Sequence, residues 1–382
     1  MSIKLTILWS ALASYNVAFF KELAISEGFS IQLVYQKISS EAPFEPFDLS
    51  FCETALEDSP QARPDLETLV DRFAPDCVLM TSWAYSHFMR ITRKLRRRGI
   101  YVVSAIDNQW GGTIKQYLGI LSAAFFLWPS IDTFLVTGDR QAAFARRLGY
   151  HDPLYGFYAA EVERFFCEVP INVRPPAFLY AGRLAPVKNI SELARAYRLY
   201  RAQIEKPWSL RVAGTGPLAD ELNGVPGVEL LGFVQPNDLP GVMRSARCLV
   251  LPSLFEPWGV VVQEAAAAGL PVIASHNCGA ATRYIHDGVN GYIVPPRADE
   301  IAAAMVRISR ATETEMLDMS RAGVQLASLW TPSKLAAYFH ARFCERMPAG
   351  LSIAAAHGLR AAQADGARNT DVDSPSPSAE DS

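Results

Sequence analysis

Two glutamates, Glu256 and Glu264, lie eight positions apart in the segment 254–269, which reads LFEPWGVVVQEAAAAG. Glu256 falls in a turn-forming stretch with Pro257 and Gly259, and the second glutamate falls in a helix-forming run. We therefore expect Glu256 at the mouth of a helix and Glu264 about two turns along it. Open backbone N–H groups at a helix start bind anions, and carboxylates accept hydrogen bonds from sugar hydroxyls. The pattern suits a nucleotide sugar, although two glutamates at this spacing also arise by chance.

A basic loop is the second candidate for chemistry. Residues 178–189 read FLYAGRLAPVKN, which predicts a strand ending at Gly182, a loop with Arg183 and Lys188, and a helix capped by Asn189 or Ser191. Ligands of open α/β sheets bind beyond the carboxyl ends of the strands. Two cations beside a helix start suit a diphosphate there. Lys188 alone is equally compatible with a basic surface loop.

Two glycine-containing turns follow other predicted strands. In LRVAGTGPL, residues 210–218, the absent side chains of Gly214 and Gly216 let a ligand approach the backbone, although turn geometry explains them equally well. In LLGFV, residues 230–234, the loop with Phe233 and Val234 can hold a nucleobase through its backbone.

Composition limits the function classes. The chain has 382 residues, half of them hydrophobic, and a formal net charge of -3. This length suits two domains, and the charge does not favour nucleic acid as a partner. The six cysteines have no metal-binding spacing, so we expect reduced thiols in a cytosolic protein. No apolar run reaches the ~18 residues of a membrane span, and we interpret residues 3–9 as a buried first strand, not as part of a signal peptide.

Apolar strand-like runs alternate with helix-like segments, which is typical of parallel sheets in α/β proteins. The eleven runs are 5–9, 31–35, 77–81, 101–105, 133–136, 177–180, 209–213, 228–231, 248–252, 271–274 and 291–294. Eleven strands are too many for one ordinary open sheet, so the predicted fold class is α/β with two doubly wound, Rossmann-like domains.

The predicted domain boundaries follow changes in composition. Residues 159–176 contain several prolines and little periodicity, so we expect them to link a first domain, 1–158, to a second, 177–330. Residues 348–382 are predicted to be a disordered tail, because they become rich in Ala, Gly, Ser, Asp and Pro.

Five motifs occur in one order: GRLAPVKN, AGTGP, LLGFV, LPSLFEPWGVVVQEAAAAGLPVIAS and HDGVNGYIVPP. Over residues 178–297 this set resembles the retaining glycosyltransferases of family 4, the glycogen-synthase-like group, which have the GT-B fold. The resemblance implies two Rossmann-like domains that face a central cleft. It also implies that the first domain binds an acceptor and the second a nucleotide sugar, and that a last helix, residues 331–347, crosses back to the first domain.

The resemblance further implies roles for single residues. Arg183 and Lys188 would neutralise the diphosphate, Glu256 would face the hydroxyls of the donor sugar, and Glu264 would bind those of the ribose. The other donor-binding candidates are Gly182, Gly214, Gly216, Phe233, Val234, Pro257, Trp258, Gly259 and Val260. Since side-chain cations and a helix terminus carry the phosphate charge, no metal and no cofactor apart from the nucleotide sugar are expected.

Two positions depart from the family pattern. Arg283 stands where the family usually has a glutamate, in the loop after residue 275. The first-domain histidine that usually lies near the sugar is missing from residues 102–113. Asp107 is the candidate to face the donor sugar in its place, although a helix cap or turn residue is the alternative. The acceptor-side candidates are Asn108, Trp110 and Gly111.

Two further segments bear on the acceptor. Residues 83–99 are predicted to form a helix ending in five cations, which fit either solvation of a helix C-terminus or a patch for anionic lipid headgroups. Residues 114–128 are rich in large apolar side chains and fit either a buried helix or a rim for a lipid-linked acceptor. Together they suggest peripheral contact with the cytoplasmic face of the membrane, with a water-soluble acceptor as the alternative.

The sequence thus favours a cytoplasmic, metal-independent, retaining glycosyltransferase that moves a sugar from a nucleotide diphosphate sugar to a glycan or lipid-linked acceptor. Surface polysaccharide or glycolipid assembly is the expected setting. One alternative is a nucleotide-sugar 2-epimerase of the same fold, which would need no acceptor. The other is a catalytically weak nucleotide-binding partner subunit, which the absent histidine and Arg283 suggest.

Overall fold

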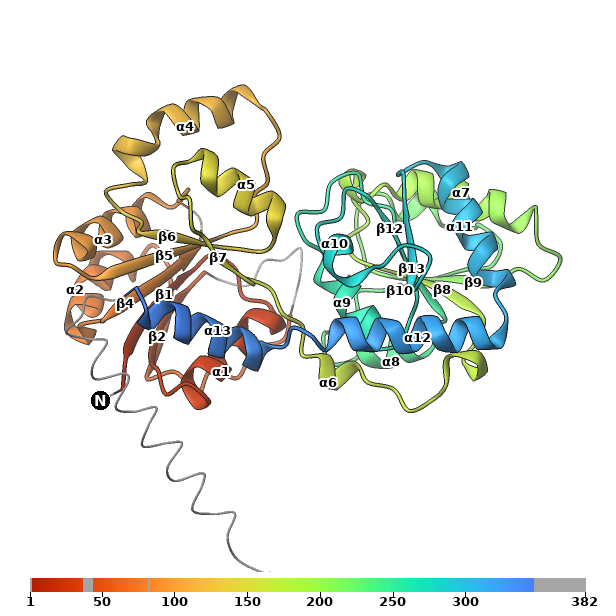
Figure 1. The fold of residues 1–382 in the computed structure, drawn as a ribbon, viewed down its shortest axis with the longest axis horizontal. Helices are drawn as coiled ribbons and strands as arrows, with labels where there is room; N and C mark the ends of the chain where they lie inside the picture. Colours follow the sequence, from red (N-terminus) through yellow and green to blue (C-terminus); the bar gives the residue numbers. More distant parts are fainter. Residues whose placement is uncertain (1, 37–43, 82, 347–382) are drawn as a thin grey trace, which may run out of the picture.

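The computed structural model describes residues 2–36, 44–81 and 83–346, and the predicted tail over 348–382 lies outside them. Two parallel sheets form two domains side by side (Figure 1). The strand order is β3-β2-β1-β4-β5-β6-β7 in the first sheet and β10-β9-β8-β11-β12-β13 in the second. Both orders are doubly wound, because the chain reverses direction across the sheet after its first three strands.

The first sheet is buried on both faces. Its strands are β1 (Lys4–Trp9), β2 (Ser30–Tyr35), β3 (Thr54–Glu57), β4 (Cys77–Thr81), β5 (Tyr101–Ile106), β6 (Thr133–Val136) and β7 (Leu154–Tyr155). Alternate residues of β1 point into different cores: Leu5, Ile7 and Trp9 into one, and Leu8 into the other. Such continuous apolar strands need helices on both sides of the sheet.

Helices cover both faces of this sheet. The first core contains α1 (Ser14–Ile25) and α13 (Pro332–Cys344), and the second contains α2 (Arg63–Phe73), α3 (Ser86–Arg97) and α5 (Asp139–Arg147). Helix α4 (Ile114–Phe126) contributes only one buried residue of its own, Ala123. In Figure 1, α4 lies at the outer edge of the domain.

The second domain has one core around its sheet. The strands are β8 (Ala177–Ala181), β9 (Ser209–Ala213), β10 (Val228–Gly232), β11 (Cys248–Leu251), β12 (Val272–Ser275) and β13 (Gly291–Val294). The α-helices are α6 (Val162–Phe165), α7 (Ile190–Arg201), α8 (Leu239–Arg244), α9 (Val260–Ala267), α10 (Ala281–Tyr284), α11 (Ala298–Arg310) and α12 (Glu313–Ala327). Helices α7 and α11 pack together on one face, and α9 and α12 on the other.

All eleven predicted strands are present, and β3 and β7 are two that the apolar pattern did not reveal. Strand β3 is an edge strand whose side chains are largely exposed, so its sequence, TALE, contains no apolar run. Strand β7 has only two residues. Among the described residues, no helix is both long and apolar enough to cross a membrane.

Helix α13 joins the two ends of the chain. After α12 the chain leaves the second domain and α13 packs on α1 of the first domain (Figure 1). Phe339 is fully buried there, with its ring centroid 5.8 Å from that of Phe19 and 5.7 Å from that of Phe343. The first core is therefore completed by residues more than three hundred positions from its first strand.

We expect Phe339→Ala to lower the free energy of unfolding by about 3–5 kcal/mol, because it leaves a cavity in this shared core. Leu329→Ala is the control, since Leu329 is 66% exposed and its truncation should change stability by less than ~0.5 kcal/mol. Urea denaturation measures both. Equal effects of the two substitutions would mean that α13 does not stabilise the first domain.

Candidate functional site

The carboxyl ends of the central strands of both sheets line a common cavity of about 380 Å³. In doubly wound sheets this is where ligands bind, because the connections diverge there and leave a crevice. The first domain contributes the start of α1 and residues after β5 and β7, and the second contributes the loops after β8 and β11 and the start of α9. Ten predicted site residues line this cavity: Asp107, Gly182, Lys188, Val234, Glu256, Pro257, Trp258, Gly259, Val260 and Glu264.

The start of α9 places the two glutamates. Gly259 has φ 92°, and a Cβ there would lie 3.0 Å from Cγ of Glu256, so glycine is required where the loop turns into the helix. The helix begins at Val260, so Glu264 lies about one turn inside it. The expected two turns were wrong, because Pro257 and Trp258 belong to the loop and not to the helix. The shorter separation keeps both carboxyl groups on one cavity.

Lys188 and Glu256 form an ion pair inside the cavity, in which Lys188 Nζ donates to Glu256 Oε2. Both side chains are largely buried, with exposures of 15% and 11%. Ser253 Oγ also donates to Glu256 Oε2 at 3.4 Å. The pair brings a cation from the loop after β8 to a carboxylate from the loop after β11. Arg183 lies beside Gly182 but is not among the cavity-lining residues.

Asn189 has a role different from the predicted helix cap. Its side chain makes no capping bond to α7; instead Nδ2 donates to the carbonyl oxygens of Pro252 and Pro296, at 3.1 and 3.0 Å. Asn189 therefore ties the loop that carries Lys188 to the ends of β11 and β13. Ser191 lies inside the helix.

The glycine turn after β9 serves packing within the protein. A Cβ on Gly214 would lie 1.9 Å from the carbonyl oxygen of Gly182, and one on Gly216 would lie 2.5 Å from that of Leu184. Neither residue lines the cavity, so we attribute these glycines to contact between two loops. Phe233 also stays outside; its ring lies 5.9 Å from that of Phe44, whereas Val234 and Phe44 do line the cavity.

Two tyrosines and the first turn of α1 complete the cavity, and none of them was predicted. Tyr158 donates a hydrogen bond to Asp107 Oδ2 at 3.2 Å, and its ring lies 5.0 Å from that of Tyr15. Burial raises the pKa of both phenols, so each keeps its proton. Residues Ala13 and Ser14 bring the open N–H groups of α1 to the same cavity. The apolar end of β1 followed by a helix was the available signal for α1, and nothing in the sequence marked Tyr158.

Asp107 is the residue where this cavity meets a second and larger one. Burial raises the pKa of Asp107 above its ordinary value, and the charge of Glu256 raises it further, while the Tyr158 hydrogen bond lowers it. Asp107 and Tyr158 therefore belong to the wall of both cavities.

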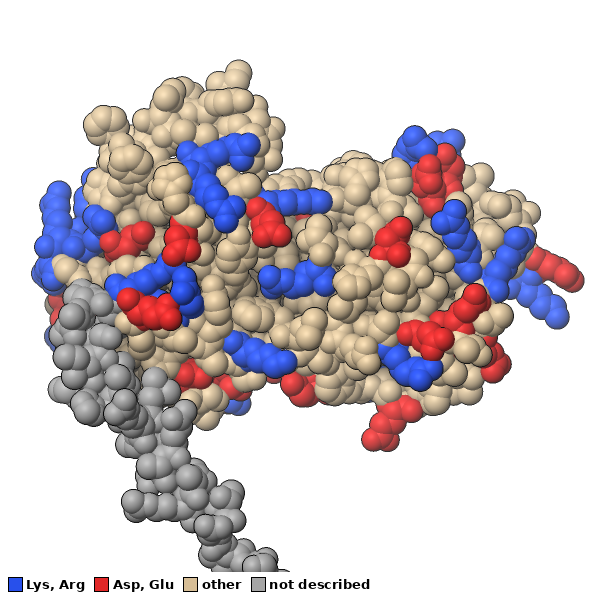
Figure 2. All heavy atoms as spheres, viewed as in Figure 1, with Lys and Arg blue, Asp and Glu red and all other residues tan. Residues whose placement is uncertain are grey.

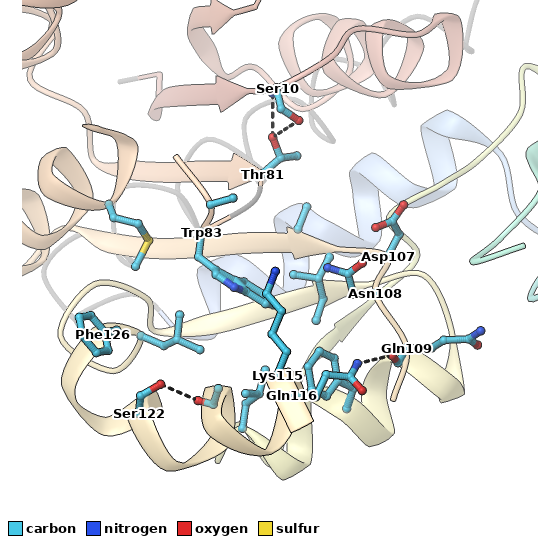
Figure 3. Close-up of a pocket in the computed structure, with 18 of the residues that line it drawn as sticks. Ser10, Thr81, Trp83, Asp107, Asn108, Gln109, Lys115, Gln116, Ser122 and Phe126 are labelled. Carbon is cyan, nitrogen blue, oxygen red and sulfur yellow. Dashed lines mark hydrogen bonds between the residues drawn. The ribbon is translucent and has the colours of Figure 1, made fainter. Parts of the chain in front are cut away.

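The second cavity has a volume of about 1120 Å³ and lies beside α4, which carries Lys115, Gln116 and Ser122 of its wall (Figure 3). It is lined by Asn108 and Gly111, as predicted, and by Trp83, Lys115 and Gln116. Trp110 is not among its lining residues. Its ring packs 4.9 Å from Tyr117, and the guanidinium of Arg147 lies 5.1 Å above it, so Trp110 supports the start of α4. Phe255 reaches the cavity from the second domain.

Arg283 lies in the joint between the domains and lines neither cavity. Its guanidinium lies between two indoles, 5.7 Å from the ring of Trp258 and 5.5 Å from that of Trp330. Each indole packs on a first-domain glycine, because a Cβ on Gly138 would lie 2.8 Å from Trp258 and one on Gly156 would lie 2.1 Å from Trp330. Arg283 therefore has a packing role in this chain.

Comparison with known proteins agrees with this geometry. Residues 175–311 match the family described as glycosyl transferases group 1. The matched part is a little over a third of the chain. It contains the loops with Gly182, Lys188 and Glu256 and the helix with Glu264.

Individual relatives cover parts of the chain. An uncharacterized glycosyltransferase of Methanocaldococcus jannaschii is 35% identical over 139 residues, which is 34% of this chain and 35% of that protein. The O-antigen chain mannosyltransferase B of Escherichia coli is 31% identical over 106 residues, or 26% of this chain and 28% of that protein. The matched segment thus spans about a third of the length of each of these two relatives.

A solved structure covers nearly the whole chain. The HepE protein of Anabaena, solved in complex with UDP and glucose, superposes with a TM-score of 0.70 and 14% identity over 90% of this chain and all of that one. This similarity establishes the fold, and with the two doubly wound sheets it confirms the expected GT-B architecture.

Glu264 gives the site a measurable pH dependence. Burial raises its pKa from the ordinary 4.5 to about 7, with Arg164 acting in the opposite direction. A carboxyl group with a raised pKa holds its proton more tightly in the folded chain, so its contribution to stability is full below pH ~4.5 and is lost as the pH rises through about 7.

We therefore expect Glu264→Gln to match the wild type in stability near pH 4.5 and to exceed it by about 1–3 kcal/mol at pH 8, because the variant buries no charge. Denaturation of the unliganded proteins across this pH range measures the difference. Glu163→Gln, on the short helix α6, is the control and should show no such trend. A stability difference that does not change with pH would contradict the raised pKa.

Proposed function

We propose that the protein transfers a sugar from a nucleotide diphosphate sugar to an acceptor hydroxyl. The observation that carries the proposal is the meeting of the two cavities at Asp107 and Tyr158. The smaller cavity contains the family loops and holds the donor. The larger cavity lies in the first domain and holds the acceptor.

The groups around the smaller cavity suit a nucleoside diphosphate sugar. The starts of α1 and α9 both present open N–H groups, and Lys188 adds a full positive charge, so phosphate oxygens are stabilised from both domains. Glu264 accepts hydrogen bonds from the ribose, and Glu256 does so from the sugar. Because HepE was solved with UDP and glucose, UDP and its sugars are the first donors to test.

The proposed reaction retains the anomeric configuration. The acceptor oxygen bonds to the anomeric carbon on the face from which the diphosphate oxygen departs, and the electron pair of the broken bond leaves with the nucleoside diphosphate. The hydroxyl proton passes to the departing phosphate oxygen. Lys188 and the two helix starts carry the negative charge that develops on the leaving group, which is why the proposal includes no metal ion.

The larger cavity favours transfer over epimerisation. An epimerase converts a nucleotide sugar without a second substrate, whereas a cavity of about 1120 Å³ is large enough for a separate acceptor. The side chain of Arg283 lies away from both cavities, so its substitution for glutamate leaves the proposed donor contacts in place.

The proposed acceptor is a glycan or a lipid-linked glycan, in surface polysaccharide or glycolipid assembly at the cytoplasmic face of the membrane. The similarity to an O-antigen chain mannosyltransferase supports this setting. The exposed apolar residues on the outer side of α4, whose inner side lines the larger cavity, support a lipid-linked acceptor in particular.

The test combines nucleotide binding with a transfer assay. Purified protein is first screened by thermal shift against nucleoside diphosphates and their sugars with and without EDTA, since a ligand of the folded state raises the melting temperature. A shift with one nucleotide family that survives EDTA is expected. Absence of any shift would overturn the donor site.

With the donor identified, we expect Lys188→Met to lower kcat/KM for transfer by roughly a hundredfold to a thousandfold, because it removes a charge that stabilises the leaving group. Lys206→Met is the matched control, since Lys206 is exposed in a loop and lines neither cavity. NMR of the product tests retention through the anomeric configuration of the new linkage. Turnover that is unchanged in Lys188→Met would contradict the assigned role.

A further inference from the structure

Helix α4 has its apolar side turned outward. A surface helix of a soluble domain normally buries its apolar stripe and exposes its polar side. In α4 the side toward the cavity consists largely of small or polar residues, including Gln116, Gly119 and Ser122. The opposite side exposes Ile114, Leu118, Leu121 and Phe125, at 80%, 60%, 75% and 75%.

These exposed residues form one continuous stripe. Positions 114, 118, 121 and 125 are spaced by three or four residues and so lie along one face of the helix. Tyr117, Phe126 and Trp128 flank this stripe and are also exposed. The segment thus holds seven of the seventeen large apolar residues that are exposed in the described part of the chain. A contiguous apolar surface of this kind marks an interaction site.

The charged side chains nearest to α4 are mainly basic. Residues 108–131 contain one charged residue, Lys115, and no acid. Arg90 and Arg93 of α3 line the cavity next to α4, and Arg93 Nη2 donates to the carbonyl oxygens of Phe125 and Phe126. Arg147 of α5 lies near the other end, over Trp110. Figure 2 shows the outer part of the first domain, at α4, as a surface without charged side chains, with both basic and acidic side chains below it.

This combination favours an anionic lipid surface as the occupant. An interfacial helix needs an apolar face that enters the acyl region and cations that meet the headgroups, and aromatic rings such as Tyr117 and Trp128 suit the boundary between them. A second copy of the chain in a twofold dimer would instead bring the same cations toward each other, which is unfavourable.

We propose that α4 seats the protein on a bilayer that contains anionic lipid, with the stripe of Ile114, Leu118, Leu121 and Phe125 inserted among the acyl chains. The inference deepens the proposed membrane contact and rests on the proposed function only for the acceptor. Since the inner side of α4 lines the larger cavity, that cavity opens at the level of the headgroups. The acceptor is then an amphiphile whose sugar enters the cavity while its lipid stays in the bilayer.

The test is sedimentation of the purified full chain with vesicles. Wild type is expected to bind vesicles of phosphatidylcholine and phosphatidylglycerol, and to bind phosphatidylcholine alone at least about fivefold more weakly, because the cations lose their partners. The double variant Leu121→Glu, Phe125→Glu is expected to lose at least about tenfold in vesicle partitioning. Both positions are exposed, so the fold should tolerate the change.

The matched control is the double variant Ile25→Glu, Leu329→Glu. Each of these residues is 66% exposed and lies outside α4, so the control removes the same kind of side chain elsewhere. It should bind vesicles like the wild type. Melting temperature and nucleotide-induced shift are measured for every protein, and both should be unchanged in the α4 variant.

Three outcomes would overturn the inference: wild type that does not sediment with anionic vesicles, an α4 variant that sediments as well as wild type, or a dimer in solution that the α4 substitutions dissociate. The last result would identify a second copy as the occupant. Failure of the proposed function looks different, because vesicle binding would then persist in a protein that no nucleotide stabilises.

Discussion

The parallel arrangement of the strands is the constraint on which the rest of the molecule depends. In each sheet all the strands end at the same edge. The chain changes direction across the sheet between β1 and β4 in the first domain and between β8 and β11 in the second, and these two positions are the switch points. The two switch points face the same cavity, so residues from distant parts of the sequence meet there. Lys188 follows β8, Glu256 follows β11 and Asp107 follows β5, yet all three line the same cavity of about 380 Å³.

The buried side-chain amides of two glutamines, Gln141 and Gln263, connect the two domains beside the cavity. Gln141, at the start of α5, donates to the carbonyl oxygens of Asp107 and Pro257, at 3.0 and 2.9 Å, and so joins the two domains directly beside the cavity. Gln263, next to Glu264 on α9, accepts from the backbone N–H of Ala160 at 2.8 Å and donates to the carbonyl of Trp330. The helix that carries Glu264 is thereby tied to both crossings between the domains, and glutamines at these buried positions satisfy backbone groups that would otherwise lack partners.

The sequence predicted best what is local and periodic. Apolar runs located eleven strands, and the motif around Glu256 and Glu264 located two of the carboxyl groups that line the smaller cavity, since both features depend on neighbouring residues. It failed where distant segments meet. Tyr158 and Gln141 act through partners 51 and 116 positions away, which no spacing rule can anticipate. Gly214 and Gly216 were interpreted as room for a ligand, whereas the space beside each is filled by another loop.

Helix α4 is a second feature whose structure depends on distant segments and could not be predicted from its own sequence. Its sequence is as apolar as that of a core helix, and composition alone favoured a buried helix over an exposed apolar rim, whereas the structure exposes it. The decision comes from what lies behind it: the inner side borders a cavity of about 1120 Å³, so there is no core there for large side chains to fill. A helix that must leave this space open carries small and polar residues inward, and its apolar residues then face outward. The open cavity and the exposed apolar face of α4 are two consequences of one arrangement.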